Sequence, residues 1–204
     1  MFKNSIKVAL LGNSGVGKTC IISKYVDNHF NAFQSSTICA SYLEKVIKRG
    51  KNKYVLNLWD TAGQEKYQSL GKHFYKDAYI IILVYDITNQ KSLTSLKENW
   101  YPDVEAYGEN RVVTAVVGNK LDLYEEDNLA NEDEAKDFAK EIGAIFCLVS
   151  ASEGDNLEKL FNKVLDKFLE KDVQEKVKII EESKNIENSF IIGNKMESKK
   201  KCCK

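Results

Sequence analysis

Hydrophobic segments alternate along the chain with amphipathic segments whose apolar residues recur every three to four positions. The runs at 79–85 and 112–117 are apolar almost throughout, which is typical of strands covered on both faces in a parallel sheet. The segments with the composition of strands are 7–11, 41–48, 53–60, 79–86, 112–119 and 144–149. The segments with the spacing of helices are 18–27, 68–75, 92–107, 131–142 and 157–171.

One pair of strands is expected to be antiparallel. Segment 41–48 alternates between apolar and polar residues, and the short polar turn 49–52 joins it to 53–60 as in a hairpin. The other strands are separated by helices, which predicts parallel pairing. We therefore expect an α/β fold with a six-stranded, mostly parallel sheet, one antiparallel edge strand and helices on both faces. Ligands of such folds bind at the carboxyl ends of the strands.

Bulk composition narrows the class of protein. The chain has 204 residues, of which 43% are hydrophobic, and a formal net charge of zero. This supports one packed domain, placed at 1–171, and the neutral charge argues against a nucleic-acid partner. Residues 172–204 hold eight Lys against six Asp and Glu, which predicts a flexible tail. Because no apolar run reaches about 18 residues and the N-terminus lacks a signal pattern, we expect a cytosolic protein without a membrane span.

The strongest chemical signal is segment 12–19, Gly-Asn-Ser-Gly-Val-Gly-Lys-Thr. Its G-x-x-x-x-G-K-[ST] spacing is that of a phosphate-binding loop, in which glycines let consecutive N–H groups converge on a phosphate chain. Lys18 can reach the β- and γ-phosphates, and the Thr19 hydroxyl can coordinate Mg²⁺. A chance glycine turn is disfavoured by the position between a strand and a helix. The expected phosphate contacts are Ser14, Gly15, Val16, Gly17, Lys18, Thr19 and Cys20.

The identity of the base is expected from segment 119–122, Asn-Lys-Leu-Asp, at the end of the fifth predicted strand. The Asp122 carboxylate can accept hydrogen bonds from N1–H and the exocyclic amine of guanine, whereas adenine offers no such pair of donors. A polar mismatch of this kind rejects the wrong ligand by ~10⁴-fold or more. The N–H of Ala151, after the last strand, can bond guanine O6. The ring of Phe30 and the stem of Lys120 can cover the two sides of the purine. The expected guanine contacts are Phe30, Asn119, Lys120, Asp122, Ser150 and Ala151.

A third chemical element follows the predicted strand 53–60. Asp60 ends that strand facing the phosphate loop, which suits a water-mediated contact to Mg²⁺. The Gly63 N–H can bond the γ-phosphate, because glycine allows close backbone approach. Gln64 can orient an attacking water, and the alternative for it is an exposed loop residue. These positions predict nucleotide hydrolysis as well as nucleotide binding.

Taken together, these elements resemble those of the Ras-like small GTPases over roughly residues 5–170, and within them those of the Rab group. The resemblance to Rabs includes segments 37–42 (TICASY), 59–65 (WDTAGQE) and 74–78 (FYKDA), and a terminus with paired cysteines. Segments 33–38 and 67–70 look most like those of endosomal Rabs. The resemblance implies a P-loop NTPase G domain that hydrolyses GTP with Mg²⁺ and alternates between GTP and GDP states.

The resemblance also implies two switch segments, near 30–42 and 61–75. Thr37 would coordinate Mg²⁺ and touch the γ-phosphate only in the GTP state. Effectors would read a surface that includes Ile38, Tyr42, Trp59 and Phe74. For the three aromatic residues, ordinary core packing is an equally good interpretation.

Some positions depart from the usual Rab pattern. Rabs usually have Gly where Cys39 stands, and an acidic, small or apolar residue at Ser41. Ser152 replaces the more usual Lys, which affects one packing contact near the base, and Lys76-Asp77 replaces a common Arg-Gly or Arg-Asp. These departures bear on effector identity rather than on nucleotide binding.

The chain has only two arginines, Arg49 and Arg111, and neither lies in an expected switch segment. In phosphoryl transfer an arginine can stabilise charge on the γ-phosphate, an effect worth ~10³–10⁵-fold in rate. We therefore expect slow intrinsic hydrolysis, with an activating protein supplying the arginine.

The terminal residues 199–204 read Lys-Lys-Lys-Cys-Cys-Lys. The C-a-a-X pattern is not met, because Lys201 stands fourth from the end. The resemblance to Rabs instead implies geranylgeranylation of Cys202 and Cys203. Two prenyl chains give stable anchoring, and the neighbouring lysines attract anionic lipid.

The same resemblance implies the partners of such a switch. The apolar patch 190–192 is similar to the segment that Rabs offer to their prenylation escort, although a sticky linker is equally possible. The other implied partners are effectors, an exchange factor, a GTPase-activating protein and a GDP-dissociation inhibitor. The implied location is the cytoplasmic side of intracellular membranes, most simply endosomes, in exchange with the cytosol.

Three other functions are alternatives to a Rab-like GTPase. A P-loop kinase or metabolic NTPase would need an acceptor pocket and a lid, for which the predicted connections are short. A GTP-dependent interaction module without hydrolysis would differ only at Gln64. A Ras- or Rho-type signalling GTPase is disfavoured by the terminus and by the lack of a Rho-type insert after Asp122. His29 and His73 have no evident catalytic partner and are interpreted as structural or surface residues.

Overall fold

The computed structural model describes residues 5–34, 37, 41–61, 76–107, 112–124 and 129–174. The chain forms two compact units, Met1–Asp166 and Lys167–Lys204. The expected helix at 68–75 lies outside the described residues, as does the tail from 175 onward. In the described part of the second unit, residues 167–174 are helical.

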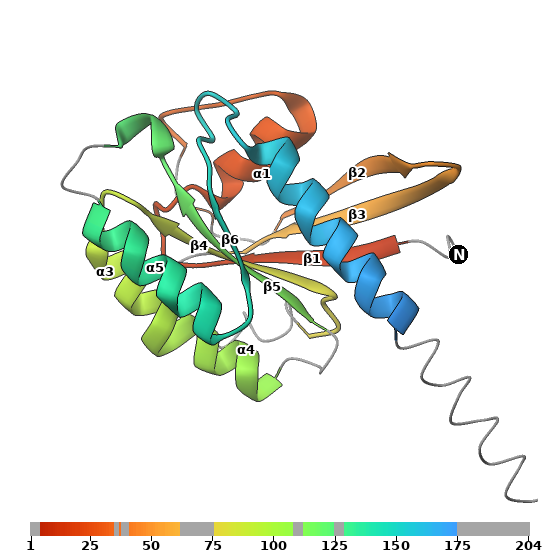
Figure 1. The fold of residues 1–204 in the computed structure, drawn as a ribbon. Helices are drawn as coiled ribbons and strands as arrows, with labels where there is room; N and C mark the ends of the chain where they lie inside the picture. The colour runs from red at the N-terminus through yellow and green to blue at the C-terminus, as the bar shows by residue number, and fades with distance from the viewer. Residues whose placement is uncertain are drawn as a thin grey trace, which may run out of the picture. The chain divides into compact units, whose positions relative to one another are not determined.

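The first unit is built on one mixed sheet (Figure 1). Its strands are β1 (Ser5–Leu11), β2 (Ser41–Arg49), β3 (Asn52–Asp60), β4 (Ile80–Asp86), β5 (Val113–Asn119) and β6 (Ile145–Leu148). The six strands lie in the order β2-β3-β1-β4-β5-β6, and only β2 and β3 pair in antiparallel fashion. The predicted α/β fold with one antiparallel edge strand is confirmed.

The helices of this unit are α1 (Lys18–Asp27), α3 (Gln90–Ser95), the π-helical η2 (Leu96–Trp100), α4 (Tyr101–Tyr107), the 3₁₀-helical η3 (Leu121–Leu123) and α5 (Leu129–Glu141). Residues 157–166 are also helical. Where one regular helix was expected at 92–107, the structure has α3, η2 and α4 in direct succession. The hydrophobic spacing of that segment predicts a helix but does not reveal a single wider turn within it.

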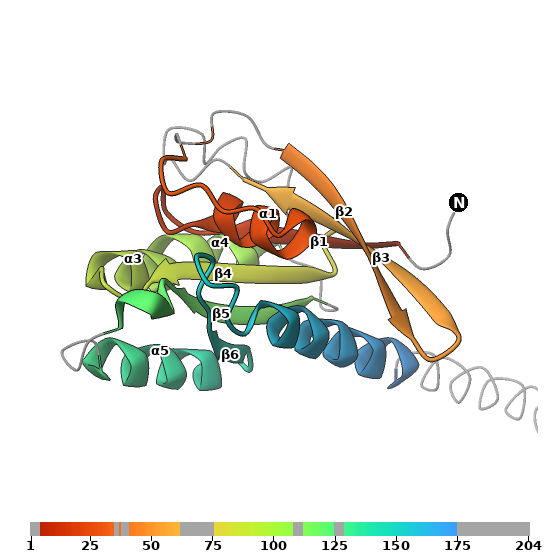
Figure 2. The ribbon, with the colours of Figure 1, turned by 90° about the horizontal axis from the view of Figure 1, so that it is seen from above.

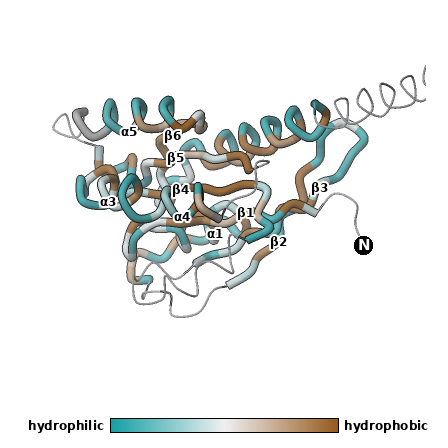
Figure 3. The backbone as a smooth tube through the Cα atoms, turned by 90° about the horizontal axis from the view of Figure 1, so that it is seen from below, coloured by the Kyte–Doolittle hydropathy of each residue, from teal (hydrophilic) through white to brown (hydrophobic). Residues whose placement is uncertain are grey.

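The core forms on both faces of the sheet. Alternate residues of β4, such as Ile81 and Leu83, pack against Leu93, Trp100 and Phe138 from α3, η2 and α5. Figure 1 shows α3, α4 and α5 together on one side of the sheet and α1 on the other, and Figure 2 shows α5 beside the edge strand β6. The hydropathy colouring of Figure 3 shows hydrophobic central strands flanked by helices with polar outer turns. Because helices cover both faces, β4 is buried at all seven positions.

On the α1 face, Tyr25 stacks on Phe161 with ring centroids 3.8 Å apart. Strands β1, β3, β5 and β6 all run in the same direction, because every neighbouring pair from β3 to β6 is parallel. Their carboxyl ends therefore bring four loops to one edge of the sheet. That edge carries the candidate site. No helix in the described part of the chain is both long and apolar enough to cross a membrane.

Candidate nucleotide-binding site

The loop between β1 and α1 has a backbone that only glycine accommodates at two positions. Gly12 has φ +140°, and a Cβ there would lie 2.1 Å from the Val84 carbonyl oxygen. Gly17 has φ +94°, and a Cβ there would lie 2.3 Å from the Asn119 side-chain nitrogen. Helix α1 starts directly after Gly17, and this N-cap residue makes no side-chain hydrogen bond to the first N–H groups of the helix. The start of α1 therefore presents free donors and a positive dipole end to a bound anion.

Lys18 is held inside this loop. Its ammonium donates to the carbonyl oxygens of Gly12 at 2.7 Å and Asn13 at 3.0 Å, and the residue is only 5% exposed. Burial lowers the pKa of Lys18 to about 8, while the charge of Asp60 acts in the opposite direction. A phosphate beside this ammonium would replace the hydration that burial removes.

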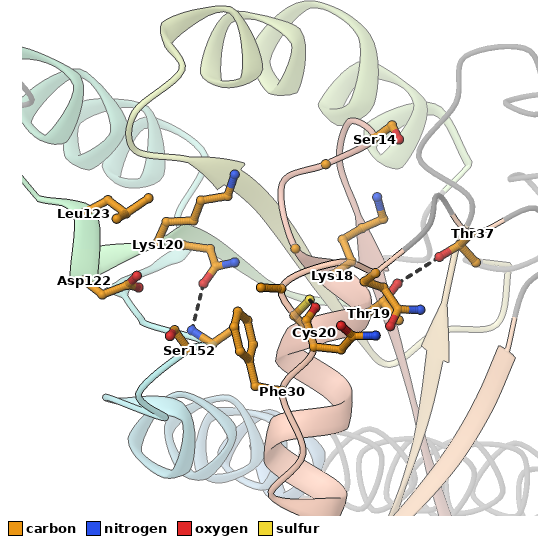
Figure 4. A pocket seen from close by; sticks show the side chains of 17 residues that line it. Ser14, Lys18, Thr19, Cys20, Phe30, Thr37, Lys120, Asp122, Leu123 and Ser152 are labelled. Atoms are coloured by element: carbon orange, nitrogen blue, oxygen red, sulfur yellow. Dashed lines mark hydrogen bonds between the residues drawn. The ribbon is translucent and has the colours of Figure 1, made fainter.

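Three oxygen-bearing side chains converge next to Lys18. Thr19 Oγ1 donates to Asp60 Oδ2 at 2.7 Å, and Thr37 Oγ1 lies 2.8 Å from Thr19 Oγ1 and 3.4 Å from the same carboxylate oxygen. Figure 4 shows Thr19 and Thr37 pointing toward each other. Burial raises the pKa of Asp60, which the hydrogen bond from Thr19 and the charge of Lys18 partly counteract. The predicted Mg²⁺ ligands are thus brought together by three separate segments.

These residues fit a magnesium ion. All donors are oxygens, as a hard cation requires, and Asp60 Oδ1 is buried without a hydrogen-bond partner among the described residues. The described residues contain no cluster of three or more His, Cys, Asp or Glu side chains that could enclose a metal. Two hydroxyls and one carboxylate suit Mg²⁺, which keeps several waters and shares its coordination with nucleotide phosphates.

A pocket of about 240 Å³ extends from the loop toward β5 and β6 (Figure 4). Most of the predicted contacts in the described segments line it: Ser14, Gly15, Gly17, Lys18, Thr19, Cys20, Phe30, Thr37, Asn119, Lys120, Asp122 and Ala151. Residues that sequence reasoning did not assign to the ligand also line it: Asn31, Ala32, Gln34, Leu123 and Ser152. No motif marks Asn31, Ala32 and Gln34, whose only signal is their place in the expected first switch segment.

Val16 and Ser150 support the pocket instead of lining it, whereas Asn119 and Ala151 line it and also join its loops. Val16 is buried, and its carbonyl accepts a hydrogen bond from the Asn119 side chain at 2.8 Å. Asn119 Oδ1 in turn accepts the Ala151 N–H at 3.1 Å. In this structure the Ala151 N–H, expected to face guanine O6, is therefore bonded to Asn119. Asn119 joins the phosphate loop to the loop that follows β6.

The predicted base receptor is fixed in the same way. Ser150, which is fully buried, donates from Oγ to Asp122 Oδ1 at 2.6 Å. This leaves Asp122 Oδ2 and the remaining lone pair of Oδ1 to accept donors from a base. Phe30, with 37% of its surface exposed, and the stem of Lys120 also line this part of the pocket.

The backbone of Lys120 is left-handed, with φ +72°, and its ammonium lies 2.6 Å from Asp86 Oδ2. The other oxygen of Asp86 accepts the backbone N–H of Thr88 at 2.9 Å and its hydroxyl at 2.7 Å. Sequence reasoning missed Asp86. The available signal was an acidic residue at the end of an otherwise apolar strand, β4.

The aromatic residues expected at an effector surface are partly described. Tyr42 and Trp59 face each other across β2 and β3, with ring centroids 5.3 Å apart, and Tyr42 is 43% exposed. The Lys7 ammonium lies 5.2 Å from the centroid of the Trp59 ring. The other expected residues in this group, and further ones with predicted roles, lie outside the described residues: Ile38, Cys39, Gly63, Gln64, Phe74, Cys202 and Cys203.

Comparison with known proteins agrees with this geometry. Residues 7–170 match the model of the Ras family. The Ras-related protein Rab-30 of Homo sapiens is 39% identical over 155 residues, covering 76% of this chain and 75% of that protein. The Ras-related protein Rab-31 of Homo sapiens is 39% identical over 159 residues, covering 78% and 80%. The Ras-related protein SEC4 of Saccharomyces cerevisiae is 32% identical over 202 residues, covering 99% and 93%.

Proposed function

This chain belongs to the Ras family of small GTPases and, within it, to the Rab proteins, and from that membership we propose that it is a switch of endocytic vesicle trafficking. As a Rab protein it hydrolyses GTP and acts as a molecular switch in vesicle trafficking, with GTP or GDP and Mg²⁺ as its ligands. The endocytic assignment rests on segments 33–38 and 67–70, which resemble those of endosomal Rabs. A tagged copy should co-localise with internalised cargo, and exclusive labelling of another compartment would contradict the assignment.

The position of Thr37 carries the proposed switching mechanism. Its hydroxyl lies 2.8 Å from that of Thr19 although the residues are far apart in sequence, and both hydroxyls reach Asp60. Mg²⁺, when bound, supplies positive charge that these oxygens and the β- and γ-phosphates share. Thr37 therefore ties the segment 30–42 to the triphosphate state, and loss of the γ-phosphate frees that segment.

The proposed hydrolysis needs an oriented water and stabilisation of charge on the γ-phosphate. Lys18 supplies one positive charge, and Gln64 is proposed to orient the water. Among the described residues Arg49 is the sole arginine, and its guanidinium bonds Asn162 at 2.7 Å and Asp166 at 2.8 Å instead of lining the pocket. We therefore expect slow intrinsic turnover and an arginine supplied by an activating protein.

The variant Gln64→Leu tests this assignment. It should keep GTP bound even with an activating protein, because a leucine cannot hydrogen-bond the attacking water. Gln90→Leu is the matched control, since Gln90 bonds Glu134 of α5 and does not line the pocket. Single-turnover hydrolysis of preloaded GTP is the measurement. Fast turnover of the unassisted wild type, or normal stimulated turnover of Gln64→Leu, would contradict the proposal.

Membrane recruitment is proposed to depend first on prenylation of Cys202 and Cys203. The neighbouring lysines then add attraction to anionic lipid. A prenylation escort and a GDP-dissociation inhibitor would handle the lipidated tail, and an exchange factor would load GTP. Effectors would bind the surface of Ile38, Tyr42, Trp59 and Phe74. Mass spectrometry of the chain from cells should find both cysteines prenylated, and replacing both by serine should leave the protein in the cytosolic fraction. Unmodified cysteines on membrane-bound protein would contradict this part.

A further inference from the structure

A wide helical turn contacts the phosphate loop. The π-helical segment η2 spans Leu96–Trp100 between α3 and α4, and the backbone N–H of Tyr101 donates to the Leu96 carbonyl to close the turn. Single π-turns inserted in α-helices occur frequently at functional sites. In this chain the turn lies beside the loop at 12–17.

Two side chains of this helical segment donate to one acceptor in the loop. Ser95 Oγ and Trp100 Nε1 each lie 2.8 Å from Asn13 Oδ1. Asn99 Nδ2 further donates to Ser95 Oγ at 3.2 Å. Trp100 is only 4% exposed, so its indole N–H depends on a partner inside the protein.

The π-turn explains how both donors reach the same atom. In a regular α-helix, residues five apart are separated by about 140° around the axis. Ser95 and Trp100 would then point to different faces. The i→i+5 pattern of a π-turn brings residues five apart onto one face. The extra residue in the turn therefore lets Ser95 and Trp100 converge on Asn13.

Asn13 connects this helix to the ligand-binding groups. Its carbonyl accepts the Lys18 ammonium at 3.0 Å, and its neighbour Ser14 lines the pocket. The π-turn is also held to α5, because Lys97 within the turn forms an ion pair with Glu134 at 2.9 Å. We propose that Trp100 and Ser95 are positioning residues, which hold the phosphate loop through Asn13 and so slow the release of bound nucleotide. This inference rests on the nucleotide site described above.

Release of a fluorescent GDP analogue in the presence of Mg²⁺ measures this effect. Trp100→Phe keeps an aromatic ring in the core but removes the N–H donor, and should accelerate release about five-fold to ten-fold, the equivalent of one hydrogen bond. The preference for GTP over ATP should not change, because Asp122 and not Asn13 recognises the base. Val104→Ala is the matched control. It removes buried volume from α4, where Val104 is 5% exposed, but its side chain has no group that could hydrogen-bond Asn13, so release should stay within about two-fold of the wild type.

A double-mutant cycle separates this role from general loss of stability. Asn13→Ala removes the acceptor, so Trp100→Phe should add little further acceleration in that background. Asn13→Asp keeps acceptor oxygens in place and should restore slow release. The indole N–H resonance of Trp100 should shift much more in Asn13→Ala, which removes its hydrogen-bond acceptor, than in Val104→Ala.

The outcomes distinguish this inference from the nucleotide site itself. A wild type that binds neither GDP nor GTP would overturn the site. A wild type with slow release, whose Trp100→Phe variant releases GDP at the same rate, would overturn only the positioning role. Fully additive effects of Asn13→Ala and Trp100→Phe on the release rate would also overturn the positioning role.

Discussion

At the scale of single residues, the groups that face the nucleotide pocket are oriented by neighbours behind them. Ser150 holds one oxygen of Asp122 at 2.6 Å, and Asp86 holds the Lys120 ammonium at 2.6 Å. Asn119 uses both ends of its amide to join Val16 and Ala151. Such prior ordering lowers the entropic cost of binding. The residues proposed to contact the base and those that fix their positions are therefore separable by mutation.

Asp122→Asn tests the assignment of the base receptor. An asparagine offers an N–H₂ group where the carboxylate is proposed to accept two donors from the base, so the affinity for GTP should fall about 100-fold or more. Asp155→Asn makes the same chemical change at an exposed position outside the pocket and should have little effect. Isothermal titration with GTP and ATP measures both variants. Unchanged GTP affinity in Asp122→Asn would show that another group recognises the base.

Thr19→Asn tests the proposed Mg²⁺ site. The substitution removes the hydroxyl that donates to Asp60 at 2.7 Å and puts a longer amide in its place. Mg²⁺ should therefore bind more weakly, and GTP, which depends more on the ion than GDP does, should lose about ten-fold more affinity than GDP. Competition between GTP and GDP at fixed Mg²⁺ gives the ratio. Equal losses for both nucleotides would contradict the assignment of Thr19.

At the scale of elements, local pattern predicted most of the fold. Helix α1 begins and ends where expected, at Lys18 and Asp27, because a glycine-rich loop precedes it and its apolar spacing stops at Asn28. The strand ends also placed Asp60 and Asp122 at the site. The π-turn η2 was not predictable, since one extra residue hardly disturbs hydrophobic spacing. Nor was the Lys120–Asp86 pair, because these residues meet only once β4 and β5 are side by side.

The buried strand β4 is the element whose packing should matter most for stability. Ile82 is 0% exposed, so Ile82→Ala should lower the free energy of unfolding by about 2–5 kcal/mol through lost burial and an unfilled cavity. Val46→Ala on the edge strand β2, where Val46 is 55% exposed, should cost less than about 0.5 kcal/mol. Urea denaturation of the wild type and both variants gives the free energies of unfolding. Saturating GDP keeps the stabilisation by bound ligand equal among the three proteins. A cost below about 1 kcal/mol for Ile82→Ala would contradict the core assignment.

At the scale of the whole molecule, we propose that the nucleotide, the metal and the segment that contains Thr37 act as one coupled unit. Chelating Mg²⁺ with EDTA should accelerate GDP release by about ten-fold or more, because Lys18 and the start of α1 then face the phosphate charge without the metal. Stopped-flow fluorescence with and without EDTA measures the rate of GDP release. Identical rates would show that the oxygens of Thr19 and Asp60 do not hold a metal that matters for binding.

The most direct test of the central claim is hydrogen exchange of the peptide that contains Thr37, measured with a non-hydrolysable GTP analogue and with GDP, both with Mg²⁺. The account predicts strong protection of this peptide with the triphosphate and clear loss of protection with the diphosphate. The structure places Thr37 beside Thr19 and Asp60, and the proposed switching mechanism keeps it there only while a γ-phosphate is bound. Equal protection with both nucleotides would contradict it.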